Sequence, residues 1–181
     1  DPRLFIVWQQ GWRDIDLAVS SFGQGIAVTP LQMLRAVSTI ANGGRLVTPH
    51  LVNKIISPSL IKTLPVQTAP RIISEVAAAQ ITQMMVNGVN QGEVRYYKPP
   101  GFLIAGKTGT AQVPIEGHYD KDQVIASFIG FAPVDNPKFA MLVTLNNPQT
   151  SPWGSTTAAP LWFEIGQQLL KYFAIPPKTN I

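Results

Sequence analysis

The chain has 181 residues, of which 45% are hydrophobic and 13% are charged, and its formal net charge is +4. These values are typical of one globular domain with its own core and with fewer charges than the usual ~25%. The positive charge does not indicate nucleic-acid binding, because the lysines and arginines are scattered and no two are adjacent. There is no cysteine, and His50 and His118 lie far apart, so we expect no metal and no other cofactor.

Two helices are expected in the first part of the chain. The first begins at Pro30, because Thr29 and Gln32 have the spacing of a capping box and proline is favoured at the first helical position. It ends near Ala41, before an asparagine and two glycines. The second covers residues 75–89 and follows a serine N-cap.

The remainder of this first part is less regular. Residues 46–61 contain β-branched residues interrupted by prolines, which predicts a small strand or hairpin packed beside the helices. Glycines at both ends of Gly23-Gln24-Gly25 favour a turn. Residues 14–100 are therefore expected to be a mainly helical part, with an irregular segment before it.

The second part of the chain is expected to form a sheet. Residues 101–146 contain one strand around Lys107, a polar loop over 114–122, and two more strands over 124–131 and 139–145. A final helix over 160–173 has apolar residues at every fourth position and is expected to cover the back of the sheet. The fold class is therefore α+β, with an antiparallel sheet of three strands and flanking helices in one domain.

The segment Lys107-Thr108-Gly109-Thr110 carries the most chemical information. Apolar residues on both sides favour an extended strand, on which successive side chains point to opposite faces. Thr108 and Thr110 then share one face, and both hydroxyls would meet a ligand together. Gly109 leaves room for an approaching backbone. We therefore expect this strand to hold a substrate carboxylate and to dock a peptide.

Several further segments occur in an order that resembles one known family. The chain is similar to the C-terminal part of a class B penicillin-binding protein transpeptidase domain, of the cell-division and elongation type, from about Asp14 to Pro177. The segments that carry this resemblance are Ser21-Phe22-Gly23-Gln24-Gly25, Val28-Thr29-Pro30-Leu31-Gln32-Met33, Ala41-Asn42-Gly43-Gly44, Ala105-Gly106-Lys107-Thr108-Gly109-Thr110-Ala111-Gln112 and Gly154-Ser155-Thr156-Thr157-Ala158-Ala159-Pro160.

The resemblance implies a partial penicillin-binding/β-lactamase-like fold in a D,D-transpeptidase that cross-links peptidoglycan stem peptides and is acylated by β-lactams. It places Lys107 beside the substrate carboxylate as a catalytic cation, and Thr108, Gly109 and Thr110 in the substrate-binding strand. The backbone N–H of Thr110 would also be one donor of the oxyanion hole. The family is anchored in the membrane, works on its extracytoplasmic side, and has partners in division or elongation.

Two family motifs are not found where the resemblance requires them. The S-x-x-K nucleophile motif and the S-x-N motif should precede Ser21, yet the sequence contains no Ser-x-Asn and its only S-x-x-K is Ser59 to Lys62. Flanking prolines argue against the helix that such a motif needs. We therefore expect a fragment, residues 1–181, whose missing N-terminal part completes the domain, and which is inactive alone.

Two alternatives to the transpeptidase remain, and two further groups of residues are assigned no catalytic role. Ser127 is read as structural, because it lies within a strand and has no neighbouring base. A β-lactamase or β-lactam sensor would share the K-T-G motif but not the segments from Ser21 to Met33. A non-catalytic interaction module or scaffold would lack the nucleophile altogether. Asp120-Lys121-Asp122 is read as a solvated loop, with a place at the border of the substrate groove as the alternative, because it follows the strand of Thr110.

Overall fold

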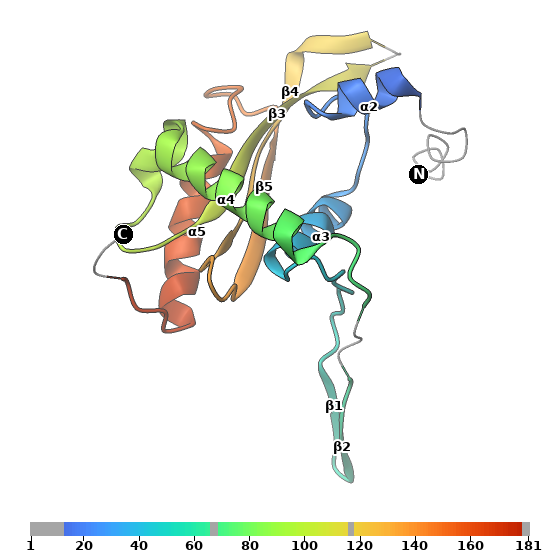
Figure 1. Ribbon diagram of the computed structural model, residues 1–181, viewed down its shortest axis with the longest axis vertical. Helices are drawn as coiled ribbons and strands as arrows, with labels where there is room; N and C mark the ends of the chain where they lie inside the picture. The colour runs from blue at the N-terminus through green and yellow to red at the C-terminus, as the bar shows by residue number, and fades with distance from the viewer. Residues whose placement is uncertain (1–12, 66–68, 116–117, 179–181) are drawn as a thin grey trace.

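A three-stranded antiparallel sheet forms the centre of the molecule (Figure 1). The computed structural model describes residues 13–65, 69–115 and 118–178, and only the backbone for 114, 115 and 118–122. The strand order is β3-β4-β5, as the sequence predicted. The strands are β3 (Ala105–Ile115), β4 (His118–Ala132) and β5 (Phe139–Asn146).

Helices cover both faces of this sheet. The last helix, α5 (Ala158–Tyr172), packs on one face, and α3 (Pro30–Ala41) and α4 (Glu75–Gln91) pack on the other. The alternation of strand side chains produces two cores, because Phe128 points to α5 while Phe131 points to α3 and α4. The fold class is thus confirmed as α+β, with the final helix behind the sheet.

The α5 face holds the largest buried aromatic cluster. Trp162 is fully buried, and its ring lies 5.1 Å from that of Phe128, centroid to centroid, in an edge-on arrangement. Its indole Nε1–H donates a hydrogen bond of 2.8 Å to the carbonyl of Met141. This bond joins α5 to the backbone of β5, so the helix is fixed by a directional contact as well as by apolar burial.

The predicted starts of α3 and α4 are confirmed, whereas α5 begins at Ala158, two residues before the predicted Pro160. The Thr29 hydroxyl accepts a hydrogen bond from the Gln32 amide at 3.2 Å, and the Gln32 side chain accepts one from the Thr29 amide at 2.8 Å. Ser74 caps α4 through the amide of Ala77 at 3.1 Å. The α4 helix extends to Gln91, slightly beyond the predicted end, because Val89 is fully buried and Gly88 lies close to the carbonyl oxygen of Gly106 in β3.

Two short helices were not predicted. Helix α2 (Asp14–Ser20) has no buried residue, so it lacks the apolar periodicity that marks a helix in a sequence. Hydrogen bonds from the Arg13 side chain and backbone cap it and hold the pKa of Asp16 at about 2. The 3₁₀ helix η2 (Glu93–Tyr97) follows α4 within a stretch that the sequence marked only as rich in turns.

The predicted polar loop over residues 114–122 is wrong. Strand β3 continues to Ile115 and β4 begins at His118, with Pro114 opposite Tyr119 and Ile115 opposite His118. A register shift between Gln112 and Pro114 lets the ladder accommodate a proline that local sequence rules treat as a strand breaker.

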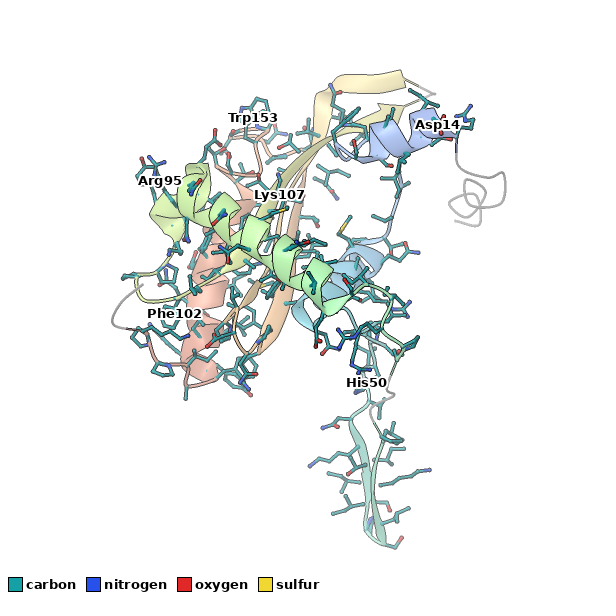
Figure 2. The ribbon with its side chains drawn as sticks, in the orientation of Figure 1. Asp14, His50, Arg95, Phe102, Lys107 and Trp153 are labelled. Carbon is teal, nitrogen blue, oxygen red and sulfur yellow. The ribbon has the colours of Figure 1, made fainter. Side chains whose placement is uncertain are left out.

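A second antiparallel pair projects away from the body, as Figures 1 and 2 show. Strands β1 (Lys54–Ser57) and β2 (Leu60–Thr63) form the predicted hairpin, but the expectation that it packs beside the helices is wrong. Every residue of both strands is exposed, including Ile55 at 51% and Ile61 at 69%. The apolar pattern alone does not reveal whether a hairpin packs on the domain.

Candidate active site

The K-T-G strand lies at one edge of the sheet. In the described part of the chain β3 pairs with β4 only, with Lys107 opposite Ile129 and Thr110 opposite Ala126. The prediction of a strand at this motif is therefore confirmed. An edge strand presents backbone N–H and C=O groups along its open side, and such groups are suited to pairing with an extended peptide.

Lys107 is exposed, and its ammonium group remains beside its own strand. Its Nζ donates a hydrogen bond of 2.8 Å to the carbonyl oxygen of Thr108. None of the ion pairs among the described residues includes Lys107. The positive charge is therefore available at the strand edge to attract an anionic group.

Thr110 connects the strand to the loop that precedes α5. Its Oγ1 accepts a hydrogen bond of 3.1 Å from the amide of Gly154. Gly154 is buried, and a Cβ at this position would collide with the carbonyl oxygens of Gly109 and Ser127. The hydroxyl of Thr110 keeps its own proton, which it can donate to a ligand.

Gly109 has a packing reason for lacking a side chain. It lies opposite Ser127 in the ladder, and a Cβ there would come 2.5 Å from the Ser127 hydroxyl oxygen. From the sequence alone, the absence of a side chain at Gly109 was explained only by the approach of a ligand. Ser127 itself lies in the middle of β4, between Gly109 and Thr144 of the neighbouring strands.

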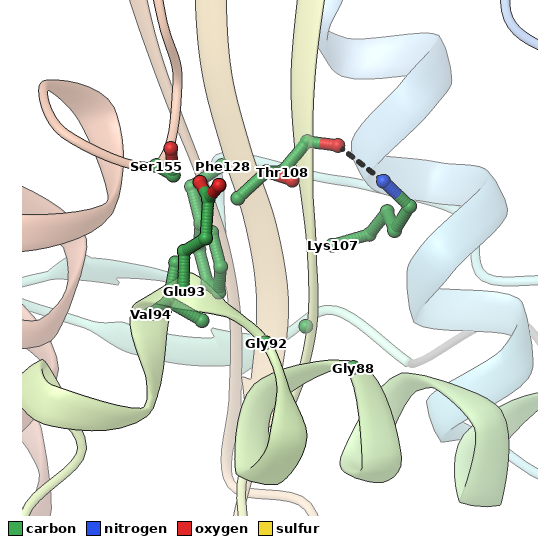
Figure 3. Close-up of a pocket in the computed structure, with 9 residues that line it drawn as sticks. Gly88, Gly92, Glu93, Val94, Lys107, Thr108, Phe128 and Ser155 are labelled. Carbon is green, nitrogen blue, oxygen red and sulfur yellow. Dashed lines mark hydrogen bonds between the residues drawn. The ribbon is translucent and has the colours of Figure 1, made fainter.

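A cavity of 340 Å³ opens beside the motif (Figure 3). Lys107 and Thr108 line it, together with two residues that the sequence analysis did not identify as site residues, Glu93 and Ser155. Ser155 belongs to a segment that carried the family resemblance, but no local signal marked Glu93. The remaining lining residues are Gly88, Gly92, Val94, Gly106 and Phe128.

Other candidates from the sequence lie elsewhere. Ser59 occupies the turn of the exposed hairpin, so Ser59 and Lys62 do not lie one helical turn apart. His50 is exposed, and its nearest polar partner is the carbonyl of Thr48 at 3.4 Å. The side chains of His118 and of Asp120-Lys121-Asp122 lie outside the described residues, although their backbone belongs to β4.

The described ranges contain neither a metal-binding cluster nor a membrane-spanning helix. No group of three or more histidine, cysteine, aspartate or glutamate side chains in these ranges could hold a metal ion. No helix in them is long and apolar enough to cross a membrane.

Comparison with known proteins identifies the family. The sequence model of the penicillin binding protein transpeptidase domain matches residues 7–169, which include both sides of the cavity. The chain belongs to this family. As a class B transpeptidase domain it is partial, because it covers only part of each relative that it matches.

The relatives of this transpeptidase domain are longer proteins. It is 38% identical to stage V sporulation protein D of Bacillus subtilis over 92% of its own length and 26% of that protein. It is 34% identical to penicillin-binding protein PbpB of Mycolicibacterium smegmatis, covering 91% of the domain and 27% of the relative. The chain thus spans about a quarter of these relatives.

Solved structures agree with this assignment. The domain superposes on penicillin-binding protein 3 of Mycobacterium tuberculosis, in its ampicillin complex, with a TM-score of 0.83 and 30% identity. The match covers 94% of this chain and 40% of that one. The aztreonam complex of the same protein gives a TM-score of 0.81. The fold prediction of a partial penicillin-binding-type domain is therefore confirmed.

Proposed function

We propose that the full-length protein carrying this chain is a peptidoglycan D,D-transpeptidase that acts through an acyl-serine and that β-lactams inhibit. The observation that supports this most directly is the placement of Lys107 and Thr108 beside a cavity, on a strand whose outer edge is unpaired among the described residues. Membership of the transpeptidase family agrees with it, and the ampicillin and aztreonam complexes of the M. tuberculosis relative support β-lactam binding.

The reaction has two acyl-transfer steps. A serine hydroxyl attacks the carbonyl between the last two residues of a donor stem peptide, the C–N bond breaks, and D-alanine leaves with the serine proton on its amine. The amine of a second stem then attacks the ester carbonyl. A new amide forms, and the serine oxygen leaves and regains a proton.

Residues of this chain supply binding and electrostatic stabilisation. The Lys107 ammonium attracts the terminal carboxylate of the donor peptide, and the hydroxyls of Thr108 and Thr110 hydrogen-bond to it. The backbone N–H of Thr110 stabilises the negative charge that develops on the reacting carbonyl oxygen. Because Gly154 holds the Thr110 side chain, this strand segment is positioned before substrate arrives.

The nucleophilic serine, in this proposal, belongs to a part of the domain outside the 181 residues. The sequence has no Ser-x-Asn, and its only S-x-x-K lies in the exposed hairpin. The chain alone is then inactive, and its partner is the rest of its own domain. We further propose that the full-length protein is membrane-anchored, acts on the extracytoplasmic side, and works with division or elongation proteins.

Labelling with a fluorescent penicillin tests this function. The full-length protein should gain a covalent adduct, detected by intact-mass analysis, while the 181-residue chain should gain none. Lys107→Ala in the full-length protein should abolish labelling. An adduct on the short chain would point to Ser59 or Ser127 as nucleophile, and labelling of neither protein would favour the scaffold.

A further inference from the structure

The cavity beside the K-T-G strand is lined by three polar side chains, Glu93, Thr108 and Ser155, that make no hydrogen bond or ion pair with another side chain or backbone group of the described residues. We propose that Glu93, Thr108 and Ser155 form a subsite that binds a primary ammonium group of the substrate peptide. This inference rests on the proposed function, in which one stem peptide presents an amine to another. It assigns a role to Glu93, which neither the motif nor the family resemblance includes.

The three side chains come from three separate elements. Glu93 is the first residue of η2, Thr108 lies in β3, and Ser155 lies in the loop before α5. Figure 3 shows the Glu93 carboxylate extending from η2 toward the side chains of Ser155 and Thr108. The Lys107 ammonium points the other way across the strand in the same view, so it does not neutralise this carboxylate.

The carboxylate of Glu93 has no cation of its own in the described part of the chain. The three ion pairs there involve Asp16, Glu75 and Asp135. Arg95, two residues away, donates to the Gln91 carbonyl and lies 4.5 Å from the ring centroid of its neighbouring tyrosine. The nearest arginine in the sequence is therefore engaged elsewhere.

The two hydroxyls are also available. No hydrogen bond among the described residues uses the side chain of Thr108 or Ser155. Ser155 is only 8% exposed and lines the cavity, so its hydroxyl lies within the protein surface beside it. A polar group in such a position usually has a hydrogen-bond partner, and a ligand would supply one.

The shape of the cavity suits an aminoalkyl group. Gly88, Gly92 and Gly106 contribute no side chain, and the apolar wall consists of Val94 and Phe128. The volume of 340 Å³ corresponds to on the order of ten water molecules at about 30 Å³ each. A short alkyl chain can therefore lie against Val94 and Phe128 while its terminal nitrogen reaches Glu93.

The oxygen atoms of Glu93, Thr108 and Ser155 favour an ammonium ion over other ligands. An ammonium has three N–H donors and no acceptor, which matches one carboxylate and two hydroxyl oxygens. An anion placed against Glu93 would be repelled, whereas the donor carboxylate belongs to the Lys107 side of Thr108, whose hydroxyl can donate its proton to that carboxylate while its oxygen accepts from the ammonium. A calcium ion requires six or more oxygen ligands, usually including several carboxylates, and this wall has only one carboxylate.

Ligand-observed NMR with the full-length protein tests the subsite directly. The probes are Nα-acetyl-L-lysine amide, which carries the ammonium, and its Nε-acetylated form, which does not. The unmodified protein should bind the amine at least roughly tenfold more tightly. Glu93→Gln, which preserves shape and removes charge, should bring this ratio close to one. Glu164→Gln, on the exposed side of α5, is the matched control and should preserve it.

Kinetic measurements then identify the source of the amine. A D-alanyl-D-alanine pentapeptide with a free side-chain amine is compared with its acetylated form as acyl donor. With the acetylated donor, the KM of an amine-bearing acceptor peptide is measured separately. If Glu93→Gln changes only the preference for the free-amine donor over the acetylated donor, the subsite binds the donor stem. If it changes only the KM of the acceptor peptide, the subsite binds the acceptor.

The outcomes separate this inference from the proposed function. Equal binding of both lysine probes to the unmodified protein, or an unchanged ratio in Glu93→Gln, overturns the ammonium subsite even if penicillin labelling succeeds. Amine-selective binding that depends on Glu93 supports the subsite even if labelling fails. In that case the transpeptidase proposal is wrong and the ammonium subsite is supported.

Discussion

The Thr110 hydroxyl accepts a hydrogen bond of 3.1 Å from the Gly154 amide, 44 positions further along the chain. This contact joins the K-T-G strand to the loop that carries Ser155, so the two sides of the cavity are held by one bond. Gly154 is buried against the backbone of β3 and β4, so this bond lies where the loop packs on the sheet.

Thr110→Val should therefore destabilise the domain. The substitution keeps the shape of the side chain but leaves the buried Gly154 amide without an acceptor, which costs about 1–3 kcal/mol. Thr110→Ser retains the hydroxyl and should cost less. Denaturant unfolding of the full-length protein measures the difference. Equal stability of the two variants would mean that the loop is held by other contacts.

Trp162→Phe should also destabilise the domain, by at least about 2 kcal/mol. The smaller ring leaves a gap beside Phe128, and the Met141 carbonyl loses its donor. Trp153, which is 60% exposed, provides the control, because Trp153→Phe should change stability by less than about 0.5 kcal/mol. Similar melting temperatures for both variants would contradict the role of the indole N–H.

Two glycines with similar backbone angles should respond differently to alanine. Gly44 has φ +88° and its missing Cβ would collide with the carbonyl of Ile73, whereas Gly23 has φ +85° and open space around it. Gly23→Ala should lower the free energy of unfolding by roughly 1–2 kcal/mol, because alanine is unfavourable in the left-handed conformation. Gly44→Ala should cost clearly more, as measured by thermal unfolding. Equal costs would show that the segment around Ile73 moves freely.

The hairpin of β1 and β2 should contribute little to the stability of the body. All its strand residues are exposed, and the backbone bond from the Leu64 amide to the Asn53 carbonyl closes its base. Replacing residues 54–63 by a short glycine-serine turn should shift the melting temperature by only a few degrees. Removing the exposed isoleucines should lower binding of a hydrophobic dye. A large loss of stability would indicate that the hairpin packs on another part of the full-length protein.

The C-terminal segment is attached by an ion pair that should respond to acid. A 2.7 Å hydrogen bond from Lys178 holds the pKa of Asp135 below its ordinary value. A lowered carboxyl pKa stabilises the fold above the ordinary carboxyl range, and this stabilisation is lost as the pH falls. Both groups are about half exposed, so the effect on stability is small.

NMR titration provides the measurement for this pair. In Lys178→Met the pKa of Asp135 should rise toward that of a free aspartate, while Lys171→Met, which removes a charge on α5, should leave it unchanged. An Asp135 pKa that is insensitive to Lys178 would show that the pair does not form in solution.

Local sequence signals predicted the regular elements well. The capping box at Thr29 and the serine cap at Ser74 set the starts of α3 and α4, because capping depends only on residues within one turn. Likewise, the apolar run around Lys107 predicted the edge strand. Helix α2 and the extension of β4 to His118 were missed, because the first lacks a buried face and the second depends on cross-strand pairing.

The sequence by itself determined the chemistry of the motif: a cation, two hydroxyls and a glycine on a strand, in an order that identifies the family. Only the tertiary structure decided which groups accompany it. Glu93 and Ser155, which belong to other elements, line the same cavity as Thr108. Position 109 must be a glycine because a side chain there would collide with the Ser127 hydroxyl on the next strand. Such contacts depend on how the sheet and helices pack, which no local pattern of residues encodes.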